Sequence, residues 1–241
     1  MDGITRASAI HDQRERQAVR ATARGRTAGG RQLLAVVEVV LAATAVVLDL
    51  AIPTLVVLAL MALSLLVRRQ GPATLGFRRV RHGWSLAVTM FAFAVGWTVL
   101  AVGLLKPIEN RLTGTTQDMS QFVALEGNLG MLLTWLVLAW VVAAVGETLA
   151  YVGFVRTRVV DGVGSGPLGT AVAVLVSSVM LGLLHTEYGV VGVVISTVDG
   201  VFYNVLRSRY GTLWAPILAH GFIDTIGFVS VFLVGPVYGL W

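Results

Sequence analysis

The sequence predicts an all-α protein, a polytopic bundle of about seven transmembrane helices with its N-terminus on the inner side of the membrane. Three observations predict this fold class. Of the 241 residues, 56% are apolar and only 13% are charged, whereas a soluble domain is about 45–50% apolar and about 25% charged. The mean hydropathy of +0.81 also excludes a disordered chain, which requires low hydrophobicity. Finally, arginines stand at the ends of the apolar runs, where membrane topology is set.

The apolar runs define seven helices. A bilayer core about 30 Å thick requires about 20 apolar residues in a helix. The run from Leu33 to Val67 is too long for one span, and Asp49 and Pro53 interrupt it. We therefore expect two short helices joined by a tight turn. The seven expected helices are 32–49, 53–67, 84–105, 129–155, 168–185, 189–206 and 212–234.

The charges between these helices predict their orientation. With the N-terminus inside, sixteen of the eighteen basic residues lie in the inner segments 1–31, 68–83, 156–167 and 207–211. The two outer basic residues, Lys106 and Arg111, lie in the 106–128 loop. This bias alternates through all seven spans and places the C-terminus outside. We expect a multi-pass protein of the cell membrane, and the preference for arginine over lysine favours a bacterial one. Because the net charge of +5 reflects this topology, we expect no nucleic-acid partner.

The chain divides into three parts. Residues 1–31 form an arm with seven arginines, which we expect to lie on the anionic lipid of the inner leaflet. Residues 32–128 form the N-terminal helices and loops, and residues 129–241 contain most of the polar motifs and form the expected catalytic core. The absence of cysteine excludes disulfides, iron–sulfur clusters and thiolate zinc sites.

Ionisable side chains within the spans are few, and each costs about 2.5–3.5 kcal/mol at the bilayer centre. They are Glu38, Glu147, His185, Asp199, His220 and Asp224. We expect Glu38 to pair with a neighbouring helix or to reach the membrane interface. Asp199 lies near a stripe of small residues, Gly192, Ser196 and Gly200, which predicts a helix-packing face and a hydrogen-bonding role for the aspartate.

The remaining ionisable residues occur in a pattern. Glu147 lies about two turns inside the inner end of its helix, His185 ends the next long span, and His220 and Asp224 are four residues apart on one helical face. A carboxylate and two imidazoles from three helices are the groups required for water activation and oxyanion stabilisation. Three unrelated residues that hydrogen-bond between helices are the alternative.

Three segments carry a resemblance to a known family. They are Glu147-Thr148-Leu-Ala-Tyr151-Val152-Gly153-Phe154, Leu181-Gly-Leu-Leu-His185 and His220-Gly-Phe-Ile-Asp224. They resemble the three motifs of the CAAX-protease and bacteriocin-processing (CPBP) family of intramembrane proteases, which includes prenyl-protein endopeptidases. The family pattern is Glu-Glu-x-x-x-Arg, Phe-x-x-x-His and His-x-x-x-Asn or Asp. Thr148, Val152 and Leu181 depart from it. The resemblance covers roughly residues 129–234.

The resemblance implies an intramembrane endopeptidase that hydrolyses peptide bonds in a peptide or membrane-protein substrate, without a cofactor. Glu147 would be the general base for a water that His185 orients, and His220 with Asp224 would stabilise the oxyanion. Asp224 would either remain ionised and orient His220, or be protonated and donate to the oxyanion; we prefer the first.

Three alternatives remain at the level of sequence. Zinc held by Glu147, His185, His220 and Asp224 would also have an acceptable set of nitrogen and oxygen ligands. A catalytically inactive membrane scaffold or immunity-type protein would keep the fold without needing Glu147. A transporter could use the intramembrane carboxylates, although the two halves of the chain show no inverted repeat.

The depth of His185 poses a geometric problem. At 1.5 Å per residue, Glu147 and His220 lie about 13 and 12 Å from the inner ends of their spans, but His185 lies about 27 Å from its own. In a bundle of parallel helices, His185 would therefore be separated from the other two residues. They can meet only if the 168–185 helix is displaced or the 186–190 turn dips into the membrane.

Overall fold

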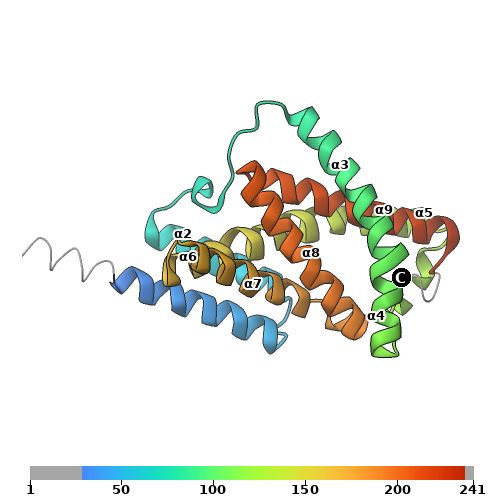
Figure 1. The fold of residues 1–241 in the computed structure, drawn as a ribbon, viewed down its shortest axis with the longest axis horizontal. Coiled ribbons are helices and arrows are strands. Elements are labelled where there is room, and N and C mark those ends of the chain that lie inside the picture. Colours follow the sequence, from blue (N-terminus) through green and yellow to red (C-terminus); the bar gives the residue numbers. More distant parts are fainter. Residues whose placement is uncertain (1–28, 237–241) are drawn as a thin grey trace, which may run out of the picture.

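The structure, a computed structural model, describes residues 29–236, and every regular element in this range is a helix (Figure 1). Five helices are long and apolar enough to cross a membrane, and two shorter apolar helices, Pro53–Arg68 and Pro167–Leu183, accompany them. All seven expected helices are therefore present, and the chain is a multi-pass helical membrane protein. Most of the Arg-rich arm, residues 1–28, lies outside the described residues.

The first two helices are the short pair that the sequence predicts. Gly29–Val47 ends in a turn in which Asp49 and Ala51 have positive φ angles of 47° and 54°. α2 (Pro53–Arg68) then begins with a proline in its first turn, where the missing N–H costs no hydrogen bond. The interruption at Asp49 and Pro53 is confirmed, and Asp49 is exposed at the turn.

Two helices are longer than expected. α3 (Gly83–Leu100), η2 (Ala101–Leu105) and α4 (Lys106–Thr113) form one continuous helix, as do α5 (Leu129–Leu138), η4 (Ala139–Val155) and α6 (Arg156–Val163). The expected ends at 105 and 155 are wrong because hydropathy marks only the apolar part of a helix. Both helices instead end at glycines with positive φ, Gly114 and Gly164, a common way for a helix to stop.

The middle of each long helix is wound as a π-helix. η2 ends two residues before Pro107, which has no N–H to donate to the preceding turn. η4 is wound in this way over 17 residues and contains Glu147 and Thr148. π-Helical segments are rare and occur frequently at functional sites.

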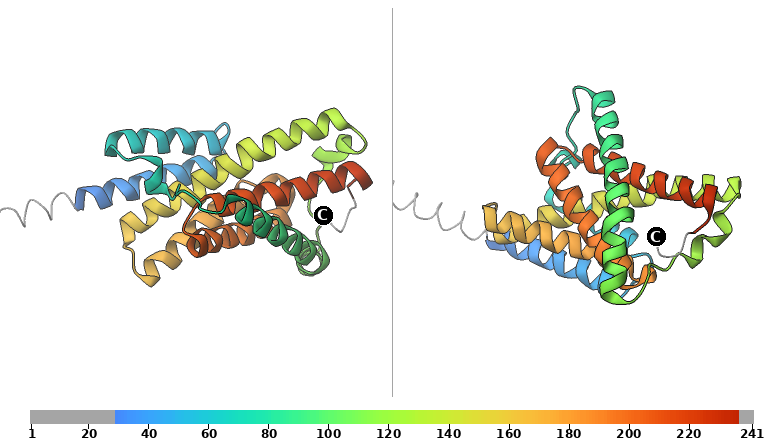
Figure 2. Two further views of the ribbon diagram at one scale, coloured as in Figure 1. Left: turned by 90° about the horizontal axis from the view of Figure 1, so that it is seen from above. Right: turned by 45° about the vertical axis from the view of Figure 1, so that its right-hand side comes forward.

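The remaining elements are η1 (Pro72–Leu75), η3 (Ser120–Leu125), α7 (Pro167–Leu183), η5 (Thr186–Tyr188), α8 (Gly189–Tyr210) and α9 (Trp214–Val234). The helices do not run parallel to one another: α3 and α4 cross α9 steeply, and α8 is oblique to both (Figure 1). In the view from above, η4 and α9 pass through the middle of the bundle (Figure 2).

The core is centred on η4. Tyr151, Val152, Phe154 and Val155 are fully buried and belong to one apolar cluster with residues of α2, α3, α7, α8 and α9. A second cluster forms where η3 packs on α5 and α9. Many leucines and valines on the outside of the bundle are exposed, as expected of surfaces that face lipid.

α7 and α8 approach each other closely through small residues. A Cβ atom at Gly182 would lie 2.0 Å from Thr197 Oγ1, and one at Gly200 would lie 2.8 Å from Ser178 Cα. The packing role predicted for Gly200 is confirmed. Ser196 of the same predicted stripe instead lines a cavity, because the stripe winds past the contact with α7.

Candidate active site

A cavity of about 480 Å³ lies between α3, η4, η5, α8 and α9. Its walls are mostly apolar, and Met119 and Phe122, from the segment before α5, cover part of it. A concave, mainly apolar pocket with a few converging polar groups is the usual form of a binding site. The polar side chains that line it include Glu147, His185, His220 and Asp224, the four residues expected from the sequence.

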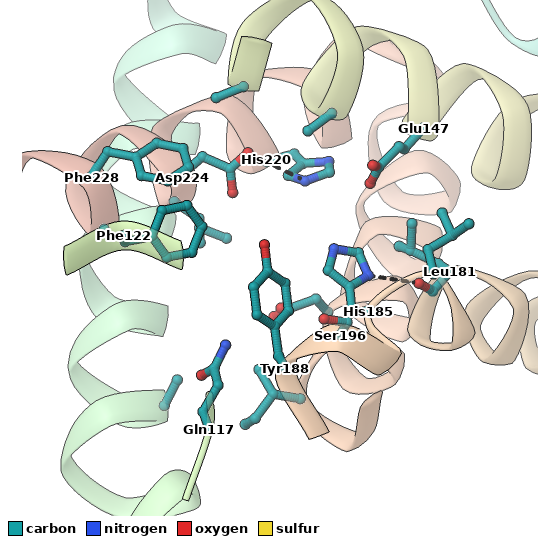
Figure 3. A pocket seen from close by; sticks show the side chains of 18 of the residues that line it. Gln117, Phe122, Glu147, Leu181, His185, Tyr188, Ser196, His220, Asp224 and Phe228 are labelled. Atoms are coloured by element: carbon teal, nitrogen blue, oxygen red, sulfur yellow. Dashed lines mark hydrogen bonds and ion pairs between the residues drawn. The ribbon is translucent and has the colours of Figure 1, made fainter. Parts of the chain in front are cut away.

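Glu147 lies on the π-wound part of its helix and points its carboxylate toward both histidines (Figure 3). Its Oε2 atom is buried and has no hydrogen-bond partner among the described residues. Buried polar atoms are nearly always paired with protein or with ordered water. The unpaired oxygen therefore faces a space in which water is the natural partner.

His185 follows the end of α7, and its ring is fixed by the backbone. Its Nδ1–H donates to the Leu181 carbonyl, with 2.9 Å between nitrogen and oxygen. Because a carbonyl oxygen can only accept, the proton of a neutral ring must be on Nδ1, which leaves a lone pair on Nε2. The ring faces the cavity between Glu147 and Tyr188 (Figure 3). Nε2 is therefore available to hydrogen-bond a water.

His220 is buried and has contacts on three sides. Its ring stacks on Tyr203 at 4.7 Å between centroids. Its Nδ1 lies 3.3 Å from the Thr148 hydroxyl, and its Nε2 lies 3.5 Å from Asp224 Oδ2. The carboxylate therefore lies beside the imidazole, as the spacing of four residues predicts.

Thr148 and Tyr188 are site residues whose roles sequence reasoning missed. Thr148 is fully buried and contacts His220 directly, although the sequence pattern marks it only as a departure from a second glutamate. Tyr188 lines the cavity, and its hydroxyl points toward the space between Asp224 and His185 (Figure 3). The signal for it in the sequence was its position about one turn after His185, which places the two side chains near each other.

The segment before α5 is held over the cavity by backbone hydrogen bonds. The Asp118 N–H donates to the Tyr188 carbonyl over 3.1 Å, and the Gly127 N–H donates to the Phe232 carbonyl over 2.9 Å. The Asp118 carboxylate accepts from the Ser120 N–H at 2.8 Å, and this bond lowers the pKa of Asp118. These contacts attach the segment to η5 at one end and to α9 at the other.

The open question about the depth of His185 is answered, because His185 lines the same cavity as Glu147 and His220. The difficulty arises for parallel helices, whereas α3 and α4 cross α9 steeply and α8 is oblique to both (Figure 1). His185 lies beyond the end of α7, where η5 turns the chain toward α8. Crossing helices bring residues at different depths along their own spans to one cavity.

The two other intramembrane carboxylates form structural contacts. Glu38 lies outside the cavity. Its carboxylate accepts from Arg68 at 2.8 Å and lies 3.1 Å from Arg158. These ion pairs confirm the expected helix pairing. Asp199 lines the cavity and accepts from the indole N–H of Trp97 at 2.5 Å. This hydrogen bond between α8 and α3 agrees with the role expected for Asp199.

A zinc site would require at least three of the cavity side chains to converge on one point. Within residues 29–236, no three histidine, aspartate or glutamate side chains are grouped closely enough to hold a metal ion. Glu147, His185, His220 and Asp224 share a cavity without forming a ligand shell. In this arrangement they are not placed as the ligands of one zinc ion.

Comparison with known proteins adds one finding. Residues 129–226 match the family model described as type II CAAX prenyl endopeptidase Rce1-like. The match includes α5, η4, α6, α7, η5 and α8 and most of α9, and therefore all four cavity residues expected from the sequence. No curated protein and no solved structure is significantly similar to the chain.

Proposed function

We propose that the chain, whose residues 129–226 match the Rce1-like model of the CAAX-protease (CPBP) family, is an intramembrane endopeptidase that activates water with Glu147. One observation carries the proposal. Four polar side chains from η4, α9 and the end of α7 line one mainly apolar cavity inside the bundle. A protease substrate is a peptide or protein, and here it would be cleaved in a membrane environment.

Glu147 is the proposed general base. A water held between its unpaired Oε2 and the lone pair on His185 Nε2 would be oriented by two acceptors. Glu147 takes one proton from this water as the oxygen attacks the carbonyl carbon of the scissile peptide bond. The same carboxyl group then returns the proton to the leaving amine as the C–N bond breaks, so the cycle balances.

His220 is the proposed partner of the oxyanion. Donation from the Thr148 hydroxyl to Nδ1 would place the proton of the neutral ring on Nε2, the nitrogen that lies 3.5 Å from Asp224. This N–H would be shared between Asp224 and the oxyanion, and an ionised Asp224 would stabilise positive charge that develops on the ring. The Tyr188 hydroxyl is a further donor at this cavity.

The test compares membranes that contain wild-type protein, Glu147→Gln or Glu126→Gln. Glutamine keeps the shape of Glu147 but cannot act as a base. Glu126 is an exposed carboxylate that does not line the cavity, so its variant controls for the loss of one charge. Proteomic identification of new peptide N-termini should find the same cleavages with wild type and Glu126→Gln, and none with Glu147→Gln.

Kinetic measurements with a peptide spanning an identified cleavage should show kcat for Glu147→Gln reduced by roughly 10²–10⁴-fold. Wild-type turnover by this variant would contradict the glutamate mechanism. Equal cleavage patterns in all three membranes, with folded protein in each, would favour an inactive scaffold. Loss of activity with a chelator and its recovery with zinc would instead favour the metal alternative.

A further inference from the structure

A second cavity of about 340 Å³ lies at the end of the bundle where η1, α6, the start of α7 and the end of α8 meet. It shares no lining residue with the cavity described above. Three arginines line it, Arg78, Arg156 and Arg207, together with the hydroxyls of Thr74, Thr157, Thr170 and Ser208. No aspartate or glutamate lines it.

Two of the arginines are held by neutral groups. Arg156 donates to the Asn204 carbonyl at 3.2 Å and to the Ser208 hydroxyl at 2.6 Å. Arg207 donates to the carbonyls of Val152 and Gly153 and to the Thr157 hydroxyl. These bonds fix the guanidinium groups but leave their charge uncompensated.

Arg78 is exposed and Arg156 and Arg207 are half-buried, and all three differ in their pairing from two arginines elsewhere in the bundle. Arg68 and Arg158 form ion pairs with Glu38, and Arg158 also pairs with Asp161. Between residues 29 and 236, no carboxylate pairs with Arg78, Arg156 or Arg207. Three positive charges therefore converge on one cavity without an anion from the described part of the chain.

The wall that carries Arg78 is attached to the turn between α8 and α9. The Leu213 N–H donates to the Gly76 carbonyl at 2.9 Å, and the Thr212 hydroxyl donates to the Arg78 carbonyl at 3.1 Å. Gly76 has a φ of +106°, and a Cβ atom there would lie only 3.2 Å from Arg207 Nε. The absent side chain leaves room for the guanidinium, and the backbone bonds preorganise the cavity.

We propose that this cavity binds a phosphate group. Guanidinium groups match the geometry of phosphate oxygens and form charge-assisted, often two-pronged hydrogen bonds with them. The Thr74, Thr157 and Ser208 hydroxyls already donate to backbone carbonyls. The Thr170 hydroxyl has no hydrogen bond within residues 29–236 and supplies a further donor. The topology predicted from the charges places this end of the bundle at the inner membrane surface, where the head groups of anionic phospholipids lie. A lipid head group and a free phosphate would present the same chemistry.

The test uses the full-length protein, purified in a maltoside detergent that contains no phosphate. The probes are phosphatidylglycerol, diacylglycerol as the matched lipid without phosphate, and inorganic phosphate at constant ionic strength. Native mass spectrometry measures how much lipid the protein retains. The shift in unfolding temperature measures the binding of either phosphatidylglycerol or inorganic phosphate. The variant is Arg78→Gln, because no side-chain hydrogen bond or ion pair of Arg78 is present among the described residues. Arg79→Gln, which lies one residue away and outside the cavity, is the control with the same change in charge.

Retention of phosphatidylglycerol over diacylglycerol, weakened at least about tenfold by Arg78→Gln but not by Arg79→Gln, supports a lipid head group as the ligand. Stabilisation by inorganic phosphate with no preference for phosphatidylglycerol, again lost only in Arg78→Gln, supports a free phosphate. Loss of retained phosphatidylglycerol when inorganic phosphate is added would show, without any variant, that the two probes compete for one site. Binding of neither probe, or equal weakening by both substitutions, would overturn the proposal.

Discussion

The contact between the Thr148 hydroxyl and Nδ1 of His220 joins two of the helices that form the cavity. Both groups are buried, and their atoms are 3.3 Å apart. The hydroxyl can donate to Nδ1 and so determine which nitrogen carries the ring proton. Thr148 would then act through His220 as a positioning residue.

We therefore expect Thr148→Val, which has nearly the same shape but lacks the hydroxyl, to lower kcat/KM of the proposed protease. The expected loss is roughly tenfold, equivalent to about 1.4 kcal/mol of transition-state stabilisation. KM should change little, because Thr148 does not line the cavity. Thr134→Val, at an exposed position on α5, is the control, and an equal loss in both variants would contradict the positioning role.

The site could be predicted from the sequence only in part, and particular residues show why. The contact between His220 and Asp224 follows from a spacing of four residues within one helix. The approach of His185 to Glu147 depends on how helices cross, which local periodicity does not encode. The contact of Thr148 with His220 joins residues 72 positions apart, and nothing in the polarity of threonine marks it.

At the scale of elements, the close contact of α7 with α8 determines where His185 lies. Gly182 is three residues before His185, and any Cβ at position 182 would meet Thr197 Oγ1 at 2.0 Å and the Val193 carbonyl at 2.7 Å. The backbone carbonyl cannot move without shifting α8. Close backbone approach through small residues is a common way for membrane helices to pack.

Gly182→Ala should consequently destabilise the protein by about 1–3 kcal/mol and also reduce activity, because the end of α7 must shift. Thermal unfolding of the purified protein measures the first effect. Gly96→Ala is the matched control, since a Cβ on this exposed position of α3 meets nothing within 4 Å. That variant should be neutral or slightly more stable, because alanine favours a helix over glycine. Equal stability of both variants would contradict the packing argument.

Another connection between elements is the buried ion cluster of Glu38, Arg68 and Arg158. Glu38 lies on the first described helix, and the arginines lie on α2 and α6. Removing the carboxylate leaves two buried guanidinium groups without this partner, which is far more costly than losing an exposed pair.

Glu38→Gln should therefore lower the free energy of unfolding by about 3–5 kcal/mol, with little effect on the turnover of protein that remains folded. Asp161→Asn provides the comparison, because Asp161 also pairs with Arg158 but its side chain is 38% exposed. Its expected cost is below about 1 kcal/mol. Similar losses in the two variants would show that burial does not determine the strength of this cluster.

At the scale of the whole molecule, hydropathy and charge predicted the number and order of the helices well. The apolar runs placed all seven helices, because burial in lipid demands long apolar segments. The helical ends at Lys106–Thr113 and Arg156–Val163 were missed, since polar residues continue a helix without contributing to its hydropathy. The crossing of α3 over α9 could not be predicted, because it results from packing between distant segments.

The charge bias also predicts the orientation of the whole chain. A reporter inserted at Gly71, which is exposed before η1, should report the inner side of the membrane. The same reporter fused after residue 241 should report the outer side, because seven spans separate the N-terminus from the C-terminus. Reporters on the same side would refute the seven-span topology.

The hydrogen bond from His185 to Leu181 has an evolutionary consequence. The acceptor is a main-chain carbonyl, so every amino acid at position 181 supplies it. Selection at this position therefore acts on the volume of a side chain that is only 2% exposed, while the imidazole keeps its tautomer. Position 181 should drift among large apolar residues, so that saturation mutagenesis finds phenylalanine, methionine and isoleucine tolerated there and charged residues rejected. The side chain at position 181 can thus change without altering which ring nitrogen of His185 carries the proton.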